Sequence, residues 1–155
     1  MYSFTTHWQL KAPLEKVWDV LYNTASWPDW WKGVLEVKEI REGAVNDIGV
    51  LFAYKWKGGN LPYSLSFTIE LKEKVDYQML RGAVSGDLEG QGTWRFEEKD
   101  GVCHIHHLWQ VRTKKKWMTQ LAFLLRPVFK HNHDKVMQWG AKGLAQLLNA
   151  ELISF

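Results

Sequence analysis

The segment covering residues 34–113 constrains the fold most, because it shows the alternation of strands and no helical period. It divides into six alternating runs, at 34–42, 48–57, 62–74, 76–86, 87–98 and 102–113. Turn-forming sequences separate several of these runs, among them Glu42-Gly43, Lys57-Gly58-Gly59-Asn60 and Lys99-Asp100-Gly101. Over 63–71, apolar residues alternate with polar ones. The segment therefore predicts six antiparallel strands, joined by hairpins, with one apolar and one polar face.

The flanking segments add a strand and three helices. Residues 2–10 alternate like a half-buried strand, and Pro13 suits the first position of a short helix after it. Ser26 is a candidate cap for a second short helix. From 117 to 152 the apolar residues follow helical spacing, and Pro127 predicts a kink or break near Arg126.

The order of these elements predicts an α+β fold. Six strands present one apolar face, and the C-terminal helix is the only large element left to cover it. We therefore expect one domain spanning 1–155, in which a curved antiparallel sheet of about seven strands wraps around that long helix. One helix cannot fill the whole concave face, so an internal cavity is expected between sheet and helix.

Composition narrows the possible contents and partners. Aromatic residues make up 14% of the chain and include ten tryptophans, which indicates a very bulky core or an aromatic-lined cavity. A net charge of +3 is too weak to indicate nucleic-acid binding. The single cysteine, Cys103, excludes an internal disulfide and fits a reducing compartment. Apolar runs fall short of a membrane span, so we expect a cytoplasmic protein without stable membrane insertion.

Strand alternation predicts which residues line the cavity. On the last strand two sets are open: Ile105, His107, Trp109 and Val111, or His104, His106 and Leu108. We favour the first set because it is the more apolar. Together with residues from the short second helix and the long helix, the predicted ligand-binding residues are Trp30, Trp31, Phe52, Trp56, Tyr63, Leu65, Phe67, Trp94, Trp109, Phe129, Asn132, Val136 and Met137.

Four polar residues are candidates for acid–base chemistry in this cavity. His107 and His133 would project into the same space from the last strand and the long helix, and Tyr54 and Arg81 would join them. Arg81 can face either way, because its strand alternates ambiguously. Each of the four is alternatively a satisfied polar group in an apolar cavity. His104 and His106 lack the further ligands of a metal site, so no metal and no cofactor is expected.

The motifs and their order resemble the START-like (SRPBCC) superfamily, which has the helix-grip fold, and most closely its polyketide cyclase/dehydrase and lipid-transport branch. The resemblance covers the whole chain and rests on Ala12-Pro13-Leu14-Glu15-Lys16-Val17-Trp18, Trp27-Pro28-Asp29-Trp30-Trp31-Lys32-Gly33-Val34, Leu61-Pro62-Tyr63, Gly86-Asp87-Leu88-Glu89-Gly90-Gln91-Gly92-Thr93-Trp94, Trp109-Gln110-Val111, Asn132-His133-Asp134-Lys135-Val136-Met137 and Gly143-Leu144. It implies a fold and not a reaction, because the superfamily includes carriers, cyclases and hydrolases.

Two functions from different classes follow from these observations. The first is binding of a small hydrophobic ligand, aromatic or polyketide-like, in the internal cavity. The alternative is a polyketide aromatase/cyclase or dehydratase that uses the polar residues above as acid, base and enolate holder, so enzymatic activity stays open. A weaker third idea is an interaction role through the basic turn at 114–117 and the tryptophan-rich short helices. We interpret the basic run itself as a solvated turn between strand and helix.

Overall fold

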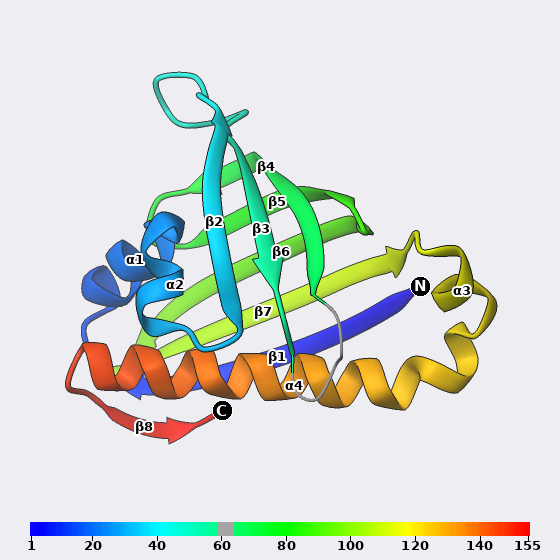
Figure 1. The fold of residues 1–155 in the computed structure, drawn as a ribbon. Coiled ribbons are helices and arrows are strands. Elements are labelled where there is room, and N and C mark those ends of the chain that lie inside the picture. Colours follow the sequence, from blue (N-terminus) through cyan, green and yellow to red (C-terminus); the bar gives the residue numbers. More distant parts are fainter. Residues whose placement is uncertain (59–63) are drawn as a thin grey trace.

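The computed structural model describes residues 1–58 and 64–155 and shows a curved antiparallel sheet wrapped around one long helix (Figure 1). The sheet has eight strands in the order β2-β3-β4-β5-β6-β7-β1-β8. The strands are β1 (Tyr2–Lys11), β2 (Val34–Arg41), β3 (Leu51–Trp56), β4 (Leu65–Val75), β5 (Met79–Gly86), β6 (Leu88–Lys99), β7 (Val102–Thr113) and β8 (Glu151–Ser154). The predicted helix-grip architecture is confirmed.

The helices lie on the concave side of the sheet and at its two ends. Helix α4 (Ala122–Leu147) runs across the sheet, with α1 (Leu14–Tyr22) and α2 (Trp27–Trp30) at one end and α3 (Lys116–Gln120) at the other (Figure 1). A single 3₁₀ turn, Thr24–Ser26, joins α1 to α2. This arrangement closes both ends of the space under the sheet.

Two boundaries of the C-terminal helix differ from the sequence-based prediction. The helical segment is interrupted at Leu121, between α3 and α4, and not near Arg126. Pro127 is accommodated inside α4, where it has no N–H to donate to the carbonyl of Phe123, a residue that is 78% exposed. The helix also ends at Leu147 and not at 152, because Asn149 adopts a left-handed conformation and the chain turns back to form β8 beside β1.

The inward set on β7 is the apolar one. Ile105, His107 and Val111 are buried, whereas His104 and His106 are partly exposed. On the outer face the His106 ring stacks on that of His7, at 4.1 Å between centroids. The alternation of β7 thus separates one buried histidine from two histidines on the convex surface.

Helix α2 approaches α4 unusually closely because α4 has glycines at the contact. A Cβ atom on Gly140 would lie 2.4 Å from the Trp31 indole, and one on Gly143 would lie 2.1 Å from the Trp30 carbonyl oxygen. The Trp31 Nε1 donates a hydrogen bond of 2.8 Å to the Val136 carbonyl. These contacts fix one end of the helix against the sheet and leave the space beside its other half unfilled.

Candidate functional site

Two adjoining cavities lie between the sheet and the helices. We call them chamber A, of about 110 Å³, and chamber B, of about 200 Å³. Chamber A lies against α4, and chamber B lies toward α1 and the β2–β3 connection. Both are lined by Trp27, Ile69, Trp94, His107 and Trp109. The two chambers therefore lie on either side of the same five side chains.

Chamber A is almost entirely apolar. Strands β3, β4, β6 and β7 supply aromatic side chains, and Tyr2 of β1 and Phe129 of α4 add an edge-on contact of 5.2 Å between ring centroids. The remaining lining residues are Phe4, Trp56, Gly58, Leu65, Phe67, Leu88, Val111, Thr113, Asn132, His133, Val136 and Met137. Gly92, on the neighbouring strand, lets the Trp109 ring lie flat there, since a Cβ would approach that ring to 2.9 Å. The alternating strands thus build an aromatic box.

Two histidines are the principal polar groups of chamber A. The rings of His107 and His133 lie nearly parallel, 6.4 Å between centroids and 10° between planes. Burial, and to a lesser extent the neighbouring His133, lowers the pKa of His107 to about 3. Burial also lowers the pKa of His133, although Asp134 opposes that shift through a 3.3 Å contact with Nδ1. Both imidazoles are therefore neutral near pH 7.

Several polar atoms around chamber A lack a hydrogen-bond partner in the part of the chain that the structure describes. They are the His107 Nδ1, the His133 Nε2 and the Trp56 Nε1, all buried. Leaving such atoms unpaired in an apolar site costs free energy. A neutral imidazole nitrogen can donate or accept, depending on the tautomer, while an indole nitrogen only donates. A ligand with oxygen or nitrogen atoms at matching positions would pair these groups.

Chamber B is more polar than chamber A. Tyr54 lies on its wall, buried, and burial raises the pKa of this phenol to about 12, so it stays protonated and can donate a hydrogen bond. Tyr22 and Asp47 also line this chamber, and the Tyr22 hydroxyl donates to the Asp47 carboxylate. Burial and the proximity of that carboxylate together raise the pKa of Tyr22. Chamber B therefore offers hydroxyl groups beside an aromatic wall.

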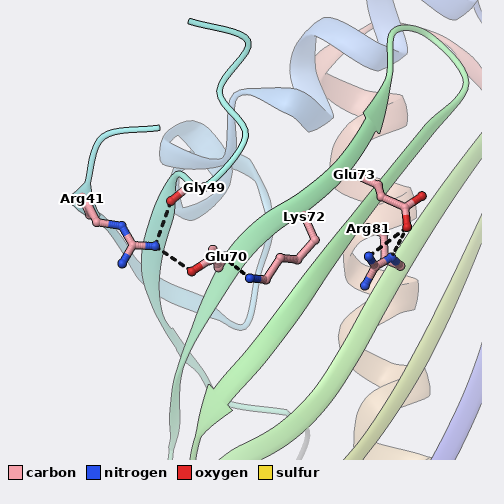
Figure 2. Close-up of polar contacts among 6 residues, drawn as sticks. All are labelled: Arg41, Gly49, Glu70, Lys72, Glu73 and Arg81. Carbon is pink, nitrogen blue, oxygen red and sulfur yellow. Dashed lines mark hydrogen bonds and ion pairs between the residues drawn. The ribbon is translucent and has the colours of Figure 1, made fainter. Parts of the chain in front are cut away.

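Arg81 borders chamber B but is bound to a carboxylate. Its Nε and a terminal nitrogen contact the same Glu73 oxygen at 2.9 and 2.8 Å (Figure 2). In the register of β4 and β5, Arg81 lies directly opposite Glu73. Figure 2 also shows the adjacent group in which Arg41 and Lys72 both pair with Glu70. Glu73 thus neutralises the charge of the guanidinium group.

The structure brings most predicted site residues together. Trp56, Leu65, Phe67, Phe129, Asn132, His133, Val136 and Met137 line chamber A, Phe52, Tyr54 and Arg81 line chamber B, and His107, Trp94 and Trp109 line both. Tyr63 lies outside the described residues. Trp30 and Trp31 line neither chamber, and Trp31 is buried against Gly140. The tryptophan of this segment that reaches both chambers is Trp27.

Some lining residues were not on the predicted list. Tyr2 and Phe4 belong to β1, whose apolar face was recognised but whose neighbour β7 was not. Tyr22 and Asp47 enter chamber B from α1 and from the β2–β3 connection. No local pattern marks a turn residue such as Asp47 as part of a cavity. Knowledge that β1 pairs with β7 would have added Tyr2 and Phe4 to the predicted lining residues.

Two further properties concern the described residues 1–58 and 64–155. Within them, no three His, Cys, Asp or Glu side chains are grouped in a way that could hold a metal ion. The helices in the same ranges are all too short or too polar to cross a membrane.

Comparison with known proteins decides the family. Residues 10–138 match the family model described as polyketide cyclase / dehydrase and lipid transport. The chain belongs to this family. The resemblance inferred from the sequence motifs is thereby confirmed, while a search of curated protein sequences gives no significant match.

Solved structures show the same fold for this polyketide cyclase/dehydrase and lipid-transport family member. The Zhui aromatase/cyclase from Streptomyces sp. R1128 is 12% identical, with 96% of this chain and 93% of that chain covered and a TM-score of 0.72. A START superfamily protein from Mycobacterium smegmatis is 9% identical, with 96% and 98% covered and a TM-score of 0.71. The protein TTHA0849 from Thermus thermophilus is 14% identical, with 94% and 99% covered and a TM-score of 0.74. At these identities the likeness establishes the fold alone.

Proposed function

We propose that the chain binds a small, largely apolar molecule with a few polar atoms in the space formed by chambers A and B. The observation that carries this proposal is the set of buried, unpaired nitrogens of His107, His133 and Trp56, found among the described residues in an otherwise apolar aromatic box. Specific small-molecule sites combine apolar walls with a few polar groups in the same way. An aromatic or polyketide-like ligand, bearing carbonyl or hydroxyl groups along a hydrocarbon frame, satisfies both requirements.

The experiment is a titration with the neutral fluorophore N-phenylnaphthylamine, comparing two phenylalanines of the same helix. Phe129 lines chamber A, whereas Phe123 is 78% exposed on the outside of α4. Phe129→Ala removes contacts with the chamber wall and should lower the affinity for the probe by about tenfold or more. Phe123→Ala should leave the affinity unchanged. Equal effects of the two substitutions, in variants with native circular dichroism, would show that the probe does not bind in the chamber.

The natural ligand can be sought directly. Native mass spectrometry of protein purified from its own host should show an adduct of small mass that Phe129→Ala reduces and Phe123→Ala retains. Because the two variants change the same residue type on the same helix, loss in both would indicate adventitious surface binding.

A second candidate function is catalysis of a cyclisation or dehydration of a poly-β-keto chain. The specific observation in its favour is the nearly parallel pair of neutral imidazoles, His107 and His133, each with an unpaired nitrogen within the described part of the chain. The reaction needs a base that accepts the acidic proton of a methylene between two carbonyls. The base would be His133 and not His107, because the Asp134 contact favours its protonated form whereas burial lowers the pKa of His107 to about 3. Protonated Tyr54 can donate to the resulting enolate. The similarity to an aromatase/cyclase fold is compatible with this chemistry.

The two functions make opposite predictions for the histidines. If the chain is a cyclase, His107→Ala and His133→Ala should abolish turnover of a polyketide substrate while retaining probe affinity within a few-fold. If it only binds, no turnover is measurable in the parent protein. Activity in the parent that is lost in both histidine variants would therefore replace the first proposal by the second.

A further inference from the structure

The chain has a concentrated apolar surface outside the cavity, on α3 and the first turns of α4. Five large apolar side chains within residues 117–128 are at least 42% exposed: Trp117, Leu121, Phe123, Leu124 and Val128. Other exposed large apolar residues, such as Leu35, Ile40 and Val75, lie singly or in twos elsewhere in the described structure. Scattered apolar residues are normal on a protein surface, but a contiguous group marks an interaction site. We call residues 114–130 the basic-apolar end.

The outer side of α4 changes character along its length. Beyond Phe129 most exposed positions are polar, as at Lys130, Asp134 and Lys135, until the exposed Leu147 at the end of the helix. Before it the exposed positions are Phe123, Leu124, Arg126, Pro127 and Val128, while Leu125 and Phe129 supply the more buried side. The outer side of the first two turns of α4 thus carries three large apolar side chains beside Arg126, and the core does not require them there.

The same segment carries a pronounced positive charge. Residues 113–133 contain five of the 20 Lys and Arg residues and none of the 17 Asp and Glu residues, so the rest of the chain has a net charge of −2. Lys114, Lys115 and Lys130 pair with Glu89, Asp87 and Asp134 at 3.3, 3.8 and 2.5 Å. Lys116 and Arg126 are exposed and form no ion pair with a carboxylate of the described residues. The charge of the basic-apolar end is therefore only partly neutralised.

The basic-apolar end also lies next to chamber A. Met118 is fully buried beneath α3, and the Thr119 hydroxyl donates a 3.0 Å hydrogen bond to the carbonyl of Thr113, a chamber A residue. Phe129, two turns into α4, lines the same chamber. Figure 1 shows α3 at the end of the molecule remote from α1 and α2. A partner bound there would touch a segment that is directly connected to the wall of chamber A.

We propose that the basic-apolar end docks on the surface of an anionic lipid bilayer. Exposed Trp, Phe and Leu side chains beside Lys and Arg are the composition of helices that lie in a membrane interface, where the rings enter the acyl boundary and the cations contact acidic headgroups. A two-fold dimer through this surface would place five basic residues against the same five. Passage of an apolar ligand between bilayer and chamber A would rest on the proposed function, but the docking itself does not.

The test is co-sedimentation of the whole protein with vesicles of phosphatidylcholine alone and of phosphatidylcholine mixed with phosphatidylserine. We expect binding to the mixed vesicles and a steep loss of binding as salt is raised. The double substitution Lys116→Glu and Arg126→Glu should weaken binding by about thirtyfold, from about fivefold for each basic residue lost. Its control, Lys16→Glu with Lys135→Glu, changes the net charge equally at exposed sites outside the basic-apolar end and should retain most of the binding.

The apolar part is tested in the same way. Phe123→Gln with Leu124→Gln should weaken vesicle binding by roughly tenfold or more, since both side chains would otherwise enter the acyl boundary. The control is Leu147→Gln, which replaces a 52% exposed leucine at the other end of α4. Equal binding to the neutral vesicles, or equal losses in variant and control, would overturn the proposal. The proposal would also be overturned if the protein formed a dimer that Phe123→Gln with Leu124→Gln abolishes. Binding to an acidic protein in the absence of vesicles would overturn it as well.

Failure of the docking and failure of ligand binding are distinguishable. Phe123→Ala should lower vesicle binding and keep the affinity for N-phenylnaphthylamine. Phe129→Ala should keep vesicle binding and lower the affinity for N-phenylnaphthylamine. Loss of both properties in one variant with native circular dichroism would place the probe on the surface and contradict both proposals. If Phe123→Ala retains both vesicle binding and affinity for N-phenylnaphthylamine, only the docking proposal is contradicted.

Discussion

Substitution of His107 by Phe should make the protein less sensitive to acid. His107 is 5% exposed, its Nδ1 has no partner among the described residues, and burial holds its pKa at about 3 in the folded chain against 6.5 ordinarily. Between these values the unfolded chain binds a proton at this position and the folded chain does not. The free energy of unfolding therefore falls as the pH falls below 6.5.

The magnitude follows from the size of that window. Each pH unit between the two pKa values removes about 1.4 kcal/mol, so lowering the pH to about 5 should destabilise the parent protein by about 2 kcal/mol through His107 alone. His133, whose pKa is also lowered, adds in the same direction. Phe keeps the aromatic contact with Trp94, whose ring centroid lies 4.2 Å from that of His107, and abolishes the proton linkage.

The assay is urea unfolding at about pH 7.5 and about pH 5, followed by circular dichroism, which gives the free energy at each pH. The parent should lose about 2 kcal/mol more than His107→Phe between the two conditions. His131→Phe, at an exposed position on α4, is the matched control and should lose as much as the parent. Identical losses in the parent and in His107→Phe would refute the argument that His107 is buried in its neutral form.

Three further substitutions test the packing. Gly140→Ala should lower stability by about 1–2 kcal/mol in urea unfolding, because the clash with Trp31 outweighs a gain in helix propensity of about 1 kcal/mol; unchanged or higher stability would contradict that close contact. Trp94→Ala removes a wall common to both chambers and should cost about 3–5 kcal/mol in the same assay, and a loss below about 1 kcal/mol would count against its packing role. Leu152→Asp, in the strand residue opposite Leu10, should lower the thermal midpoint, with no shift expected if β8 is detached from β1.

Local patterns were sufficient wherever one face of an element is buried along its whole length. The alternation over 102–113 predicted β7 with its observed bounds, Val102–Thr113, and placed His107 inward. The spacing of Asn132, Val136 and Met137 likewise placed these residues on the inner side of α4. In such elements buried positions recur at the period of the strand or helix, so several residues of the sequence indicate the same buried face.

Patterns failed where a single distant contact decides. Trp27, Trp30 and Trp31 lie on one short turn and look equivalent in sequence, but Gly140 provides the recess that receives Trp31, and Trp27 is left beside the chambers. The short strand β8 has too few residues to show an alternation and exists through its pairing with β1. Neither contact is encoded near the residues that it positions.

The place of β1 in the sheet has a consequence for how the chain folds. Its partners are β7, through pairs such as Tyr2 with Val111, and β8, through Lys11 with Glu151, while β2 follows it in the chain but lies at the opposite edge. A chain emerging from the ribosome can form the hairpins from β2 to β6 one after another, yet its first strand must wait for nearly all of the others to be synthesised. Closing so long a loop is slow, and until then the apolar faces of β1 and of the unfinished sheet stay open to aggregation. The strand that is synthesised first, β1, is thus among the last to join the sheet.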